Sequence, residues 1–339
     1  MKTSISIICI LTMLNAFSQE KRNEGSPLDN LPVNIEVLTV FGERADFSPD
    51  NKEIAFMAKS FGDAMVINLG TRMIRCLTCN VPGAVFLRVM HLANGDYLLI
   101  GPEYFENINV SRARDNELWY LSKERGSKPV KLDQRMSEGA AVSKKEMILA
   151  FTVIWDQDST LEKGESYLMV ADIDTSGNRP VLINKRKVLE SNDPACVMEA
   201  QDFYDNDSKI VYTCYEPGPP ASIYSLNLKN SEISRMSNDP GRYYEAEGIF
   251  PGGQFTCVES DKQCETLGGD AGMGNIDIWK LRLDGTGKDF VRLTNFNDYV
   301  GGKASNPVIS TDGRYMAFQY AKTTDPAGVG YGILLYKFE

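Results

Sequence analysis

The sequence contains a single histidine, His91, and this scarcity restricts the chemistry open to the protein. Nucleophilic catalysis through a Ser–His–Asp or Cys–His arrangement would have to use that residue. His91 aligns with Phe47 and Ile309 in similar segments of the chain, so we expect it to be a packed core residue. A histidine-rich metal centre is excluded by the same count. We therefore expect no cofactor and no metal site, although a calcium ion stays open.

Positive charge is scarce as well. The chain has 36 Lys and Arg against 46 Asp and Glu, a formal net charge of −10 at pH 7, and no large basic cluster. Nucleic acids and anionic lipid surfaces attract proteins through cationic patches. Unaided binding to either partner is therefore excluded.

Long apolar runs are missing too. No segment approaches the about 18 consecutive apolar residues that a membrane-spanning helix needs, so we expect no membrane insertion. The start of the chain has a short run of a different kind: Lys2 precedes an apolar stretch over 5–14, and Ala16 and Ser18 are small. This pattern is typical of a secretory signal peptide, with cleavage after Ser18. Cys9 lies inside the apolar stretch, which argues against a lipid anchor. We expect a signal peptide over 1–18, a linker over 19–33, and export to the periplasm or the medium.

Removal of Cys9 with the signal peptide leaves an even number of cysteines, which favours disulfides in an exported chain. Our preferred pairs are local, and the alternatives at the "CLTC" motif are a zinc site or redox chemistry. Zinc needs about four ligands, and a thioredoxin-like motif should open a helix, whereas "RMIRCLTC" is typical of a strand. The disulfide candidates are Cys76 with Cys79, Cys196 with Cys214, and Cys257 with Cys264.

Helical periodicity is weak throughout, whereas a turn followed by an apolar strand recurs six times. The six copies are "SPDNKEIAF" (48–56), "LANGDYLLI" (92–100), "SKKEMILAF" (143–151), "YDNDSKIVY" (204–212), "FPGGQFTCV" (250–258) and "STDGRYMAF" (310–318). A short apolar stretch precedes each copy and a second strand signal follows it; five copies also have a third. This predicts an all-β fold, a six-bladed β-propeller with four antiparallel strands in each blade.

The last copy ends at "GYGILLYKFE" without its outer strand, while "NIEVLTVF" (34–41) precedes the first copy and has no blade of its own. The "VLT" of that segment matches the "RLT" of "FVRLTNF" (290–296) and the "CLT" of the first copy. We predict that this N-terminal strand completes the last blade and closes the ring, which gives a propeller domain over 34–339. An open ring would leave unpaired strand edges.

The "FSPDNKEIAF" and "ISTDGRYMAF" segments, each with an "IxxL" strand and an "RLT" strand, resemble the repeat of TolB-like, WD-repeat-like six-bladed propellers. The resemblance covers roughly 34–339 and implies the propeller fold. It says little about activity, and the N-terminal α/β domain of TolB is not expected here.

Charged side chains, or an asparagine in the last copy, recur three to seven residues before each turn, where each innermost strand begins. Since the chain reaches every innermost strand at the same rim of a propeller, we expect these side chains to converge at one mouth of the central channel. The predicted ligand-binding residues are Arg44, Arg88, Glu138, Glu199, Glu245, Glu247 and Asn306. A solvated ring of charges lining a wet channel is the plainer interpretation.

Four long loops should gather on one face, because all of them join the second and third strands of a blade. They carry Tyr104, Phe105, Trp155 and Tyr320. We predict a monomeric, non-catalytic binding or scaffold module for a protein, peptide or glycan. The alternative is a carbohydrate-active enzyme, a glycoside hydrolase or polysaccharide lyase, that uses Glu199 and Glu245 as its carboxyl pair.

Overall fold

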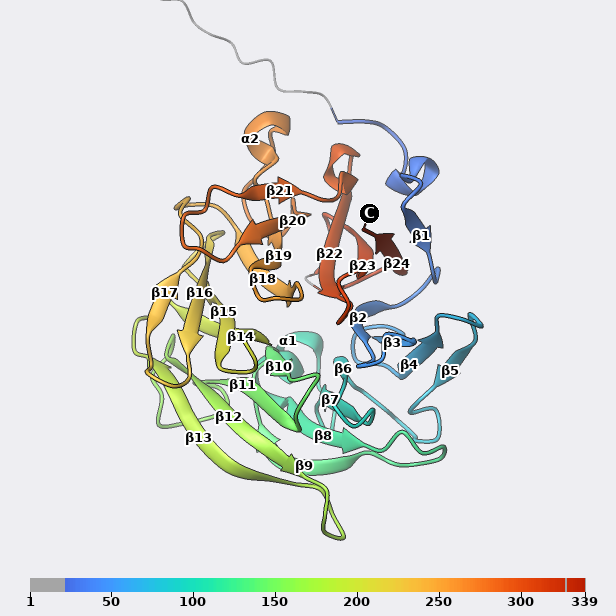
Figure 1. The fold of residues 1–339 in the computed structure, drawn as a ribbon, viewed down its shortest axis with the longest axis vertical. Helices are drawn as coiled ribbons and strands as arrows, with labels where there is room; N and C mark the ends of the chain where they lie inside the picture. The colour runs from blue at the N-terminus through green and yellow to red at the C-terminus, as the bar shows by residue number, and fades with distance from the viewer. Residues whose placement is uncertain (1–21, 327, 339) are drawn as a thin grey trace, which may run out of the picture.

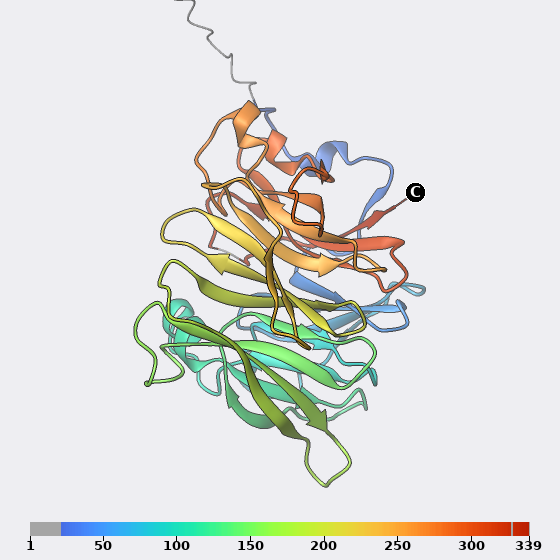
Figure 2. The same ribbon diagram turned by 60° about the vertical axis from the view of Figure 1, so that its left-hand side comes forward.

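Six four-stranded antiparallel sheets form a closed ring in the computed structural model, which describes residues 22–326 and 328–338 (Figure 1). Figure 2 shows the same ring turned by 60°, with neighbouring blades packed side by side. The propeller and its antiparallel blades are confirmed. The expected signal peptide over 1–18 lies outside the described residues.

Each of the first three blades follows the order of the chain from the channel outward. Blade 1 contains β2 (Glu43–Phe47), β3 (Glu53–Met57), β4 (Ala64–Asn68) and β5 (Ile74–Cys76). Blade 2 contains β6 (Arg88–His91), β7 (Tyr97–Gly101), β8 (Glu117–Leu121) and β9 (Val130–Arg135). Blade 3 contains β10 (Ala140–Val142), β11 (Ile148–Ile154), β12 (Ser166–Asp174) and β13 (Val181–Ser191).

The other half of the ring repeats the plan. Blade 4 contains β14 (Val197–Tyr204), β15 (Lys209–Tyr215), β16 (Ala221–Asn227) and β17 (Ile233–Arg235). Blade 5 contains β18 (Tyr244–Ile249), β19 (Phe255–Ser260), β20 (Asp277–Arg282) and β21 (Phe290–Arg292). Blade 6 contains β22 (Gly302–Ile309), β23 (Tyr315–Lys322), β24 (Ile333–Lys337) and β1 (Ile35–Val37). The short helices are η1 (Pro27–Asn30), α1 (Ile108–Val110), η2 (Ser111–Asp115), α2 (Cys264–Leu267) and η3 (Phe296–Asp298).

The ring closes between the two ends of the described chain, as predicted. β1 pairs with β24 in antiparallel register, with Ile35 opposite Tyr336 and Val37 opposite Leu334. The backbone N–H of Ile333 donates to the hydroxyl of Thr39, 2.9 Å away. The last blade is therefore built from both ends of the sequence, and no outer edge of β24 is left bare.

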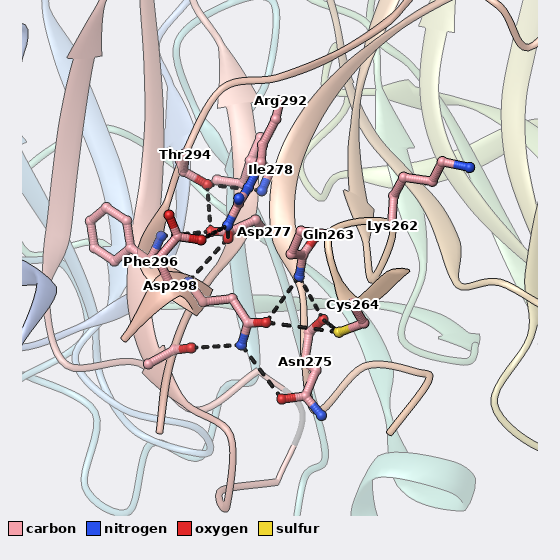
Figure 3. A network of polar contacts seen from close by, with 12 residues as sticks. Lys262, Gln263, Cys264, Asn275, Asp277, Ile278, Arg292, Thr294, Phe296 and Asp298 are labelled. Carbon is pink, nitrogen blue, oxygen red and sulfur yellow. Dashed lines mark hydrogen bonds and ion pairs between the residues drawn. The ribbon is translucent and has the colours of Figure 1, made fainter. Parts of the chain in front are cut away.

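The recurring "LT" motif has a physical role that Thr39 shares with two other threonines. The hydroxyl of Thr78 accepts from the N–H of Ala64 at 3.0 Å, and that of Thr294 accepts from the N–H of Ile278 at 2.9 Å. Figure 3 shows the copy in blade 5, where Thr294 also donates to the Asp277 carboxylate at 2.8 Å. The motif therefore fixes the outermost strand of a blade to the start of the strand beside it.

Apolar side chains between neighbouring blades form the core. Phe56, Phe151 and Phe318 occupy the same place in three turn–strand copies, and all three are fully buried. The preceding alanines, Ala55, Ala150 and Ala317, are buried as well. Because successive residues of a strand point to opposite faces, each copy supplies one side chain to each neighbouring interface.

Two of the three expected disulfides are present. Cys76 bonds to Cys79 and Cys196 bonds to Cys214, with Cα–Cα distances of 5.7 and 4.8 Å. The disulfide at "CLTC" also argues against a zinc site there.

The third expected pair is wrong: Cys257 and Cys264 are both free and buried. β19 continues for three residues beyond Cys257, roughly 10 Å of extended chain, before the turn that leads to α2. Cys257 occupies the place of Ala55 and Ala317 in the core and contacts the Met316 sulfur at 3.6 Å. Half of the segment between the two cysteines is thus strand, and it is not the hairpin loop that a disulfide would need.

The second and third strands of the blades are joined at one rim of the ring, which we call the long-loop face. The four long connections are there, as expected: 102–116, 155–165, 261–276 and 323–332. The first of them carries α1, which lies near the centre of the ring in Figure 1. Across the described ranges, no helix is both long and apolar enough to cross a membrane.

Candidate functional site at the channel mouth

A cavity of about 240 Å³ lies in the channel near the long-loop face. Six of the seven predicted ligand-binding residues line it: Arg44, Arg88, Glu138, Glu199, Glu245 and Asn306. The seventh, Glu247, lines a separate cavity of about 300 Å³ that faces the short turns, and Arg88 lines both cavities. The predicted residues are therefore brought together, with Arg88 and Glu247 at the waist between the two cavities.

Bulges in the innermost strands aim several of these side chains. β2 loses its register with β3 between Glu43 and Asp46, and β22 loses its register with β23 between Ser305 and Val308. Arg44 and Asn306 lie inside these bulges with positive φ angles of 55° and 48°. A bulge inserts an extra residue and re-aims its side chain, which here points into the channel instead of continuing the pleat.

Glu138 is the anionic centre of the mouth. Its two carboxylate oxygens accept hydrogen bonds from Arg44 and from Arg112. Burial alone would raise the pKa of Glu138, but the guanidinium groups of Arg112 and Arg44 outweigh it and hold the pKa well below its ordinary value. Glu138 therefore stays ionised, and it ties blade 1 and the loop that carries Arg112 to blade 3.

Glu199 and Glu245 are in a different state. The hydroxyl groups of Tyr215 and Tyr243 both donate hydrogen bonds to the carboxyl group of Glu245. Burial, together with the neighbouring Glu245 and Glu138 carboxyls, raises the pKa of Glu199 to about 8. Burial also raises the pKa of Glu245. A carboxyl that holds its proton near neutral pH can donate a hydrogen bond or act as a general acid.

A second carboxyl group cluster extends from Glu245 toward the waist. Carboxylate oxygens of Glu245, Glu247 and Glu259 lie within 4.8 Å of one another, which is the spacing of cation ligands. These are the described residues best placed to hold a divalent cation. Burial raises the pKa of Glu259 to about 8 and that of Glu247 well above its ordinary value. These carboxyl groups would have to release their protons to hold a metal ion, because metal ligands must be deprotonated.

Arg88 is charged and buried, yet within the described part of the chain it has no hydrogen-bond or ion-pair partner. It is 9% exposed, and its Nε atom is buried without a partner. The Ser305 hydroxyl, 4% exposed on the same cavity wall, has no described partner either. A buried polar group without a partner is costly, so two such groups facing one cavity indicate a place for a polar ligand or water.

Two glycines make room for the site. A Cβ on Gly139 would overlap the side chain of Glu199, and one on Gly328 would overlap the guanidinium of Arg44. Both glycines are needed because charged side chains pass directly over their backbone.

The sequence analysis missed several residues that line the same cavity: Arg112, Tyr215, Tyr243, Glu259 and Lys303. Lys303 is buried, donates to the Met273 carbonyl at 2.9 Å, and has a pKa lowered by that burial. The tyrosines and Lys303 are only two or three residues from predicted positions or at the end of a neighbouring strand. Strand alternation from Glu245 would have indicated Tyr243; nothing in the sequence indicated Arg112.

The aromatic residues of the long loops differ in exposure. Tyr104 and Phe105 are exposed, and Phe105 packs on Phe61 with ring centroids 4.9 Å apart. Trp155 is half-buried in its loop, whereas Tyr320 is half-buried on strand β23 and does not lie in a loop as predicted. Of these four, Tyr104 is the most open to a partner, at 79% exposed.

His91 is buried, as expected, and belongs to the wall near the short turns. Its backbone N–H donates to Asp46 at 2.6 Å, and Lys144 bonds the same carboxylate at 2.7 Å and the His91 carbonyl at 2.9 Å. Burial would raise the pKa of Asp46, but Lys144 and His91 hold it below its ordinary value. This arrangement joins blades 1, 2 and 3 and offers no nucleophile.

Comparison with known proteins supports the fold. No protein-family model and no curated protein matches the chain. A TolB-type protein from Agrobacterium tumefaciens matches at 17% identity over 76% of this chain and 77% of that chain, with a TM-score of 0.51. Oligogalacturonate lyase in complex with manganese matches at 13% identity over 88% and 78% of the two chains, with a TM-score of 0.51.

A calcium-binding protein, regucalcin, from the same Agrobacterium species matches at 10% identity over 88% and 91% of the two chains, with a TM-score of 0.53. Identities this low indicate a shared fold and not a shared site. The chain has a TolB-like six-bladed β-propeller fold, as its repeat predicted.

Proposed function

We propose that the protein is an exported, non-catalytic binding module whose protein, peptide or glycan ligand docks on the long-loop face and places a polar group in the channel mouth. The observation that carries this proposal is the pair of buried, unpartnered polar groups, Arg88 and Ser305, facing one cavity among the predicted residues. Rigid walls of β-strand hold these groups in place before a ligand arrives, which lowers the entropic cost of binding.

Export is supported by the signal-like segment over 1–18 and by the two disulfides, which persist in oxidising compartments. A periplasmic or secreted location follows from the same features.

A combined glycan and peptide array on the purified protein tests the binding proposal. A ligand should be found whose affinity falls in Glu199→Gln and Glu245→Gln, while no turnover is detected. Gly139→Ala is a useful third variant, because it displaces Glu199 without removing a charge. Unchanged affinity in all three variants would place the ligand elsewhere, and the absence of any ligand would refute the proposal.

A second candidate is a carbohydrate-active enzyme, favoured by the pKa of about 8 at Glu199 beside a second carboxyl group at Glu245. Glu199 would then act as general acid and Glu245 as its carboxylate partner. Under this alternative, Glu199→Gln should lower turnover by about 100-fold or more while the glycan still binds. Turnover that persists in Glu199→Gln would rule it out.

A further inference from the structure

Arg88 is the group in the channel that most needs a partner. It begins β6, is almost fully buried, and faces the carboxyl groups of Glu247, Glu138, Glu199 and Glu245 without forming an ion pair with any of them. A guanidinium is always charged in proteins and presents donors in a planar fork. That fork matches a carboxylate, which accepts two parallel hydrogen bonds from it.

The charge around Arg88 is complementary to an added anion. Arg44, Arg88 and Arg112 line the cavity, and Glu138 bonds both Arg44 and Arg112. The raised pKa values of Glu199 and Glu259, both about 8, leave these groups mostly protonated at neutral pH. The lining therefore carries more positive than negative charge, although the whole chain is acidic.

Exposed apolar residues lie close in the chain to the residues that line this cavity. We define the collar as Val40, Phe41, Ile108, Met273, Val300 and Tyr331, large hydrophobic residues that are exposed on the long-loop face. Met273 lines the cavity itself, and each of the others is within four residues of one that does. The six residues are between 38% and 86% exposed, so the rest of the described chain covers them only in part.

The composition of the collar favours a peptide over a sugar. Four of its six residues are aliphatic, and aliphatic side chains bury apolar side chains of a partner through the hydrophobic effect. Sugar rings are recognised mainly by flat aromatic surfaces and hydrogen bonds; the exposed aromatic rings of Tyr104 and Phe105 lie on the same face, but neither lines the cavity. A carboxylate pocket inside an apolar rim is suited to the end of a peptide chain, which carries a carboxylate beside its last side chain.

We propose that the channel mouth captures the free C-terminal carboxylate of a partner polypeptide, with Arg88 as its anchor and the collar as the contact surface for its last side chains. This inference rests on the proposed binding function and names the ligand class of that site. The carboxylate would occupy the cavity, accept hydrogen bonds from the Arg88 fork, and give the Ser305 hydroxyl an acceptor.

The test uses random octapeptides immobilised with free C-termini, the same peptides amidated, and an array of glycans that includes uronic acids. The best peptide should lose roughly 10- to 100-fold in affinity on amidation, because a charge-assisted bidentate contact is lost. Arg88→Lys should lower the affinity for the free-acid peptide by about tenfold and leave the affinity for the amidated peptide unchanged. Lysine keeps the positive charge but lacks the planar fork of donors. Arg179→Gln, an exposed arginine on the β12–β13 hairpin, is the matched control and should bind like the wild type.

The amidated peptides keep the test decisive even if the Arg88 variant folds poorly, since they are measured on the wild-type protein. Equal affinity for acid and amide would overturn the inference while leaving the binding function intact. Binding confined to uronic acid glycans would overturn it in the same way. Failure of both arrays would instead refute the proposed function itself.

Discussion

Arg44 and Glu138 lie 94 positions apart in the sequence and form an ion pair that joins blade 1 to blade 3 across the channel mouth. Arg112 approaches the same carboxylate from the loop that begins after β7. One carboxylate thus fixes two blades and the loop that carries α1 and Arg112. The site is held together by the charges that a ligand would contact, so binding and stability should respond to the same substitutions.

The first prediction concerns this ion pair. Glu138→Gln should lower the free energy of unfolding by roughly 3 kcal/mol, because two guanidinium groups lose their shared counter-charge in a mostly buried place. Urea denaturation followed by circular dichroism would measure it. Glu103→Gln, which removes an exposed ion pair with Lys131, is the control and should cost under about 1 kcal/mol. Equal effects of the two substitutions would contradict a structural role for Glu138.

The second prediction concerns pH. The pKa of Glu199 and that of Glu259 are about 8 in the folded protein, above the ordinary 4.5 expected in the unfolded chain. The folded state therefore binds more protons than the unfolded state between these values, so stability should fall as pH rises from about 5 to 8. Thermal unfolding across this range should show a falling melting temperature, with a shallower slope in Glu199→Gln and in Glu259→Gln. A melting temperature that rises with pH, or slopes unchanged in both variants, would refute the raised pKa values.

Glu138 contributes a pH dependence of stability with the opposite sign, because its pKa is held below the ordinary value. Its contribution is present at neutral pH and is lost only as strong acid protonates the carboxylate. Loss of stability in acid should therefore be weaker in Glu138→Gln than in the wild type.

The third prediction concerns ring closure. Thr39→Val should lower the free energy of unfolding by about 1–3 kcal/mol, because it leaves the buried N–H of Ile333 without its acceptor. Thr286→Val is the control, since that hydroxyl lies in an exposed turn and bonds only within it. Equal melting temperatures for Thr39→Val and the wild type would show that the Thr39 hydroxyl does not stabilise the closed ring.

The fourth prediction concerns thiols. Denatured, unreduced protein should give two titratable thiols per chain, Cys257 and Cys264, if the signal peptide has been removed. A third thiol would come from Cys9 and would mean that residues 1–18 are retained. Intact mass would resolve the two cases independently. If the titration finds no thiol in protein of the mature mass, Cys257 and Cys264 form a disulfide after all and this prediction is wrong.

The fold was open to prediction because its signals repeat. Phe56, Phe151 and Phe318 follow similar turns, and the "LT" motif marks the outermost strand in three of the six blades, so repeated weak signals reinforce one another. The same repeat also indicates that Cys257 is a core residue, because Cys257 aligns with three buried alanines. Pairing it with Cys264 relied on spacing alone and ignored that alignment.

The site was predicted in part for the same reason. Residues at the start of each innermost strand must converge when the strands form a ring, which placed Glu138, Glu199 and Glu245 together. Arg112 was missed because its position depends on how an irregular loop folds over the channel. Glu259 was missed because it lies on β19, the second strand of its blade, where it pairs with Glu245, whereas the prediction considered the innermost strands alone. Loop paths and bulges are set by tertiary packing, and a single sequence carries little trace of either.

The pairing of β1 with β24 also determines when the protein can finish folding. Asn34 and Lys337 are 303 positions apart, so closure is among the most non-local steps in the molecule. During synthesis the ring must stay open until β24 has left the ribosome, and the apolar walls of blades 1 and 6 face water until then. Contacts of such separation form slowly. Once made, they must be broken before either end can unravel, which gives the finished ring a lasting resistance to proteases that act on opened chains.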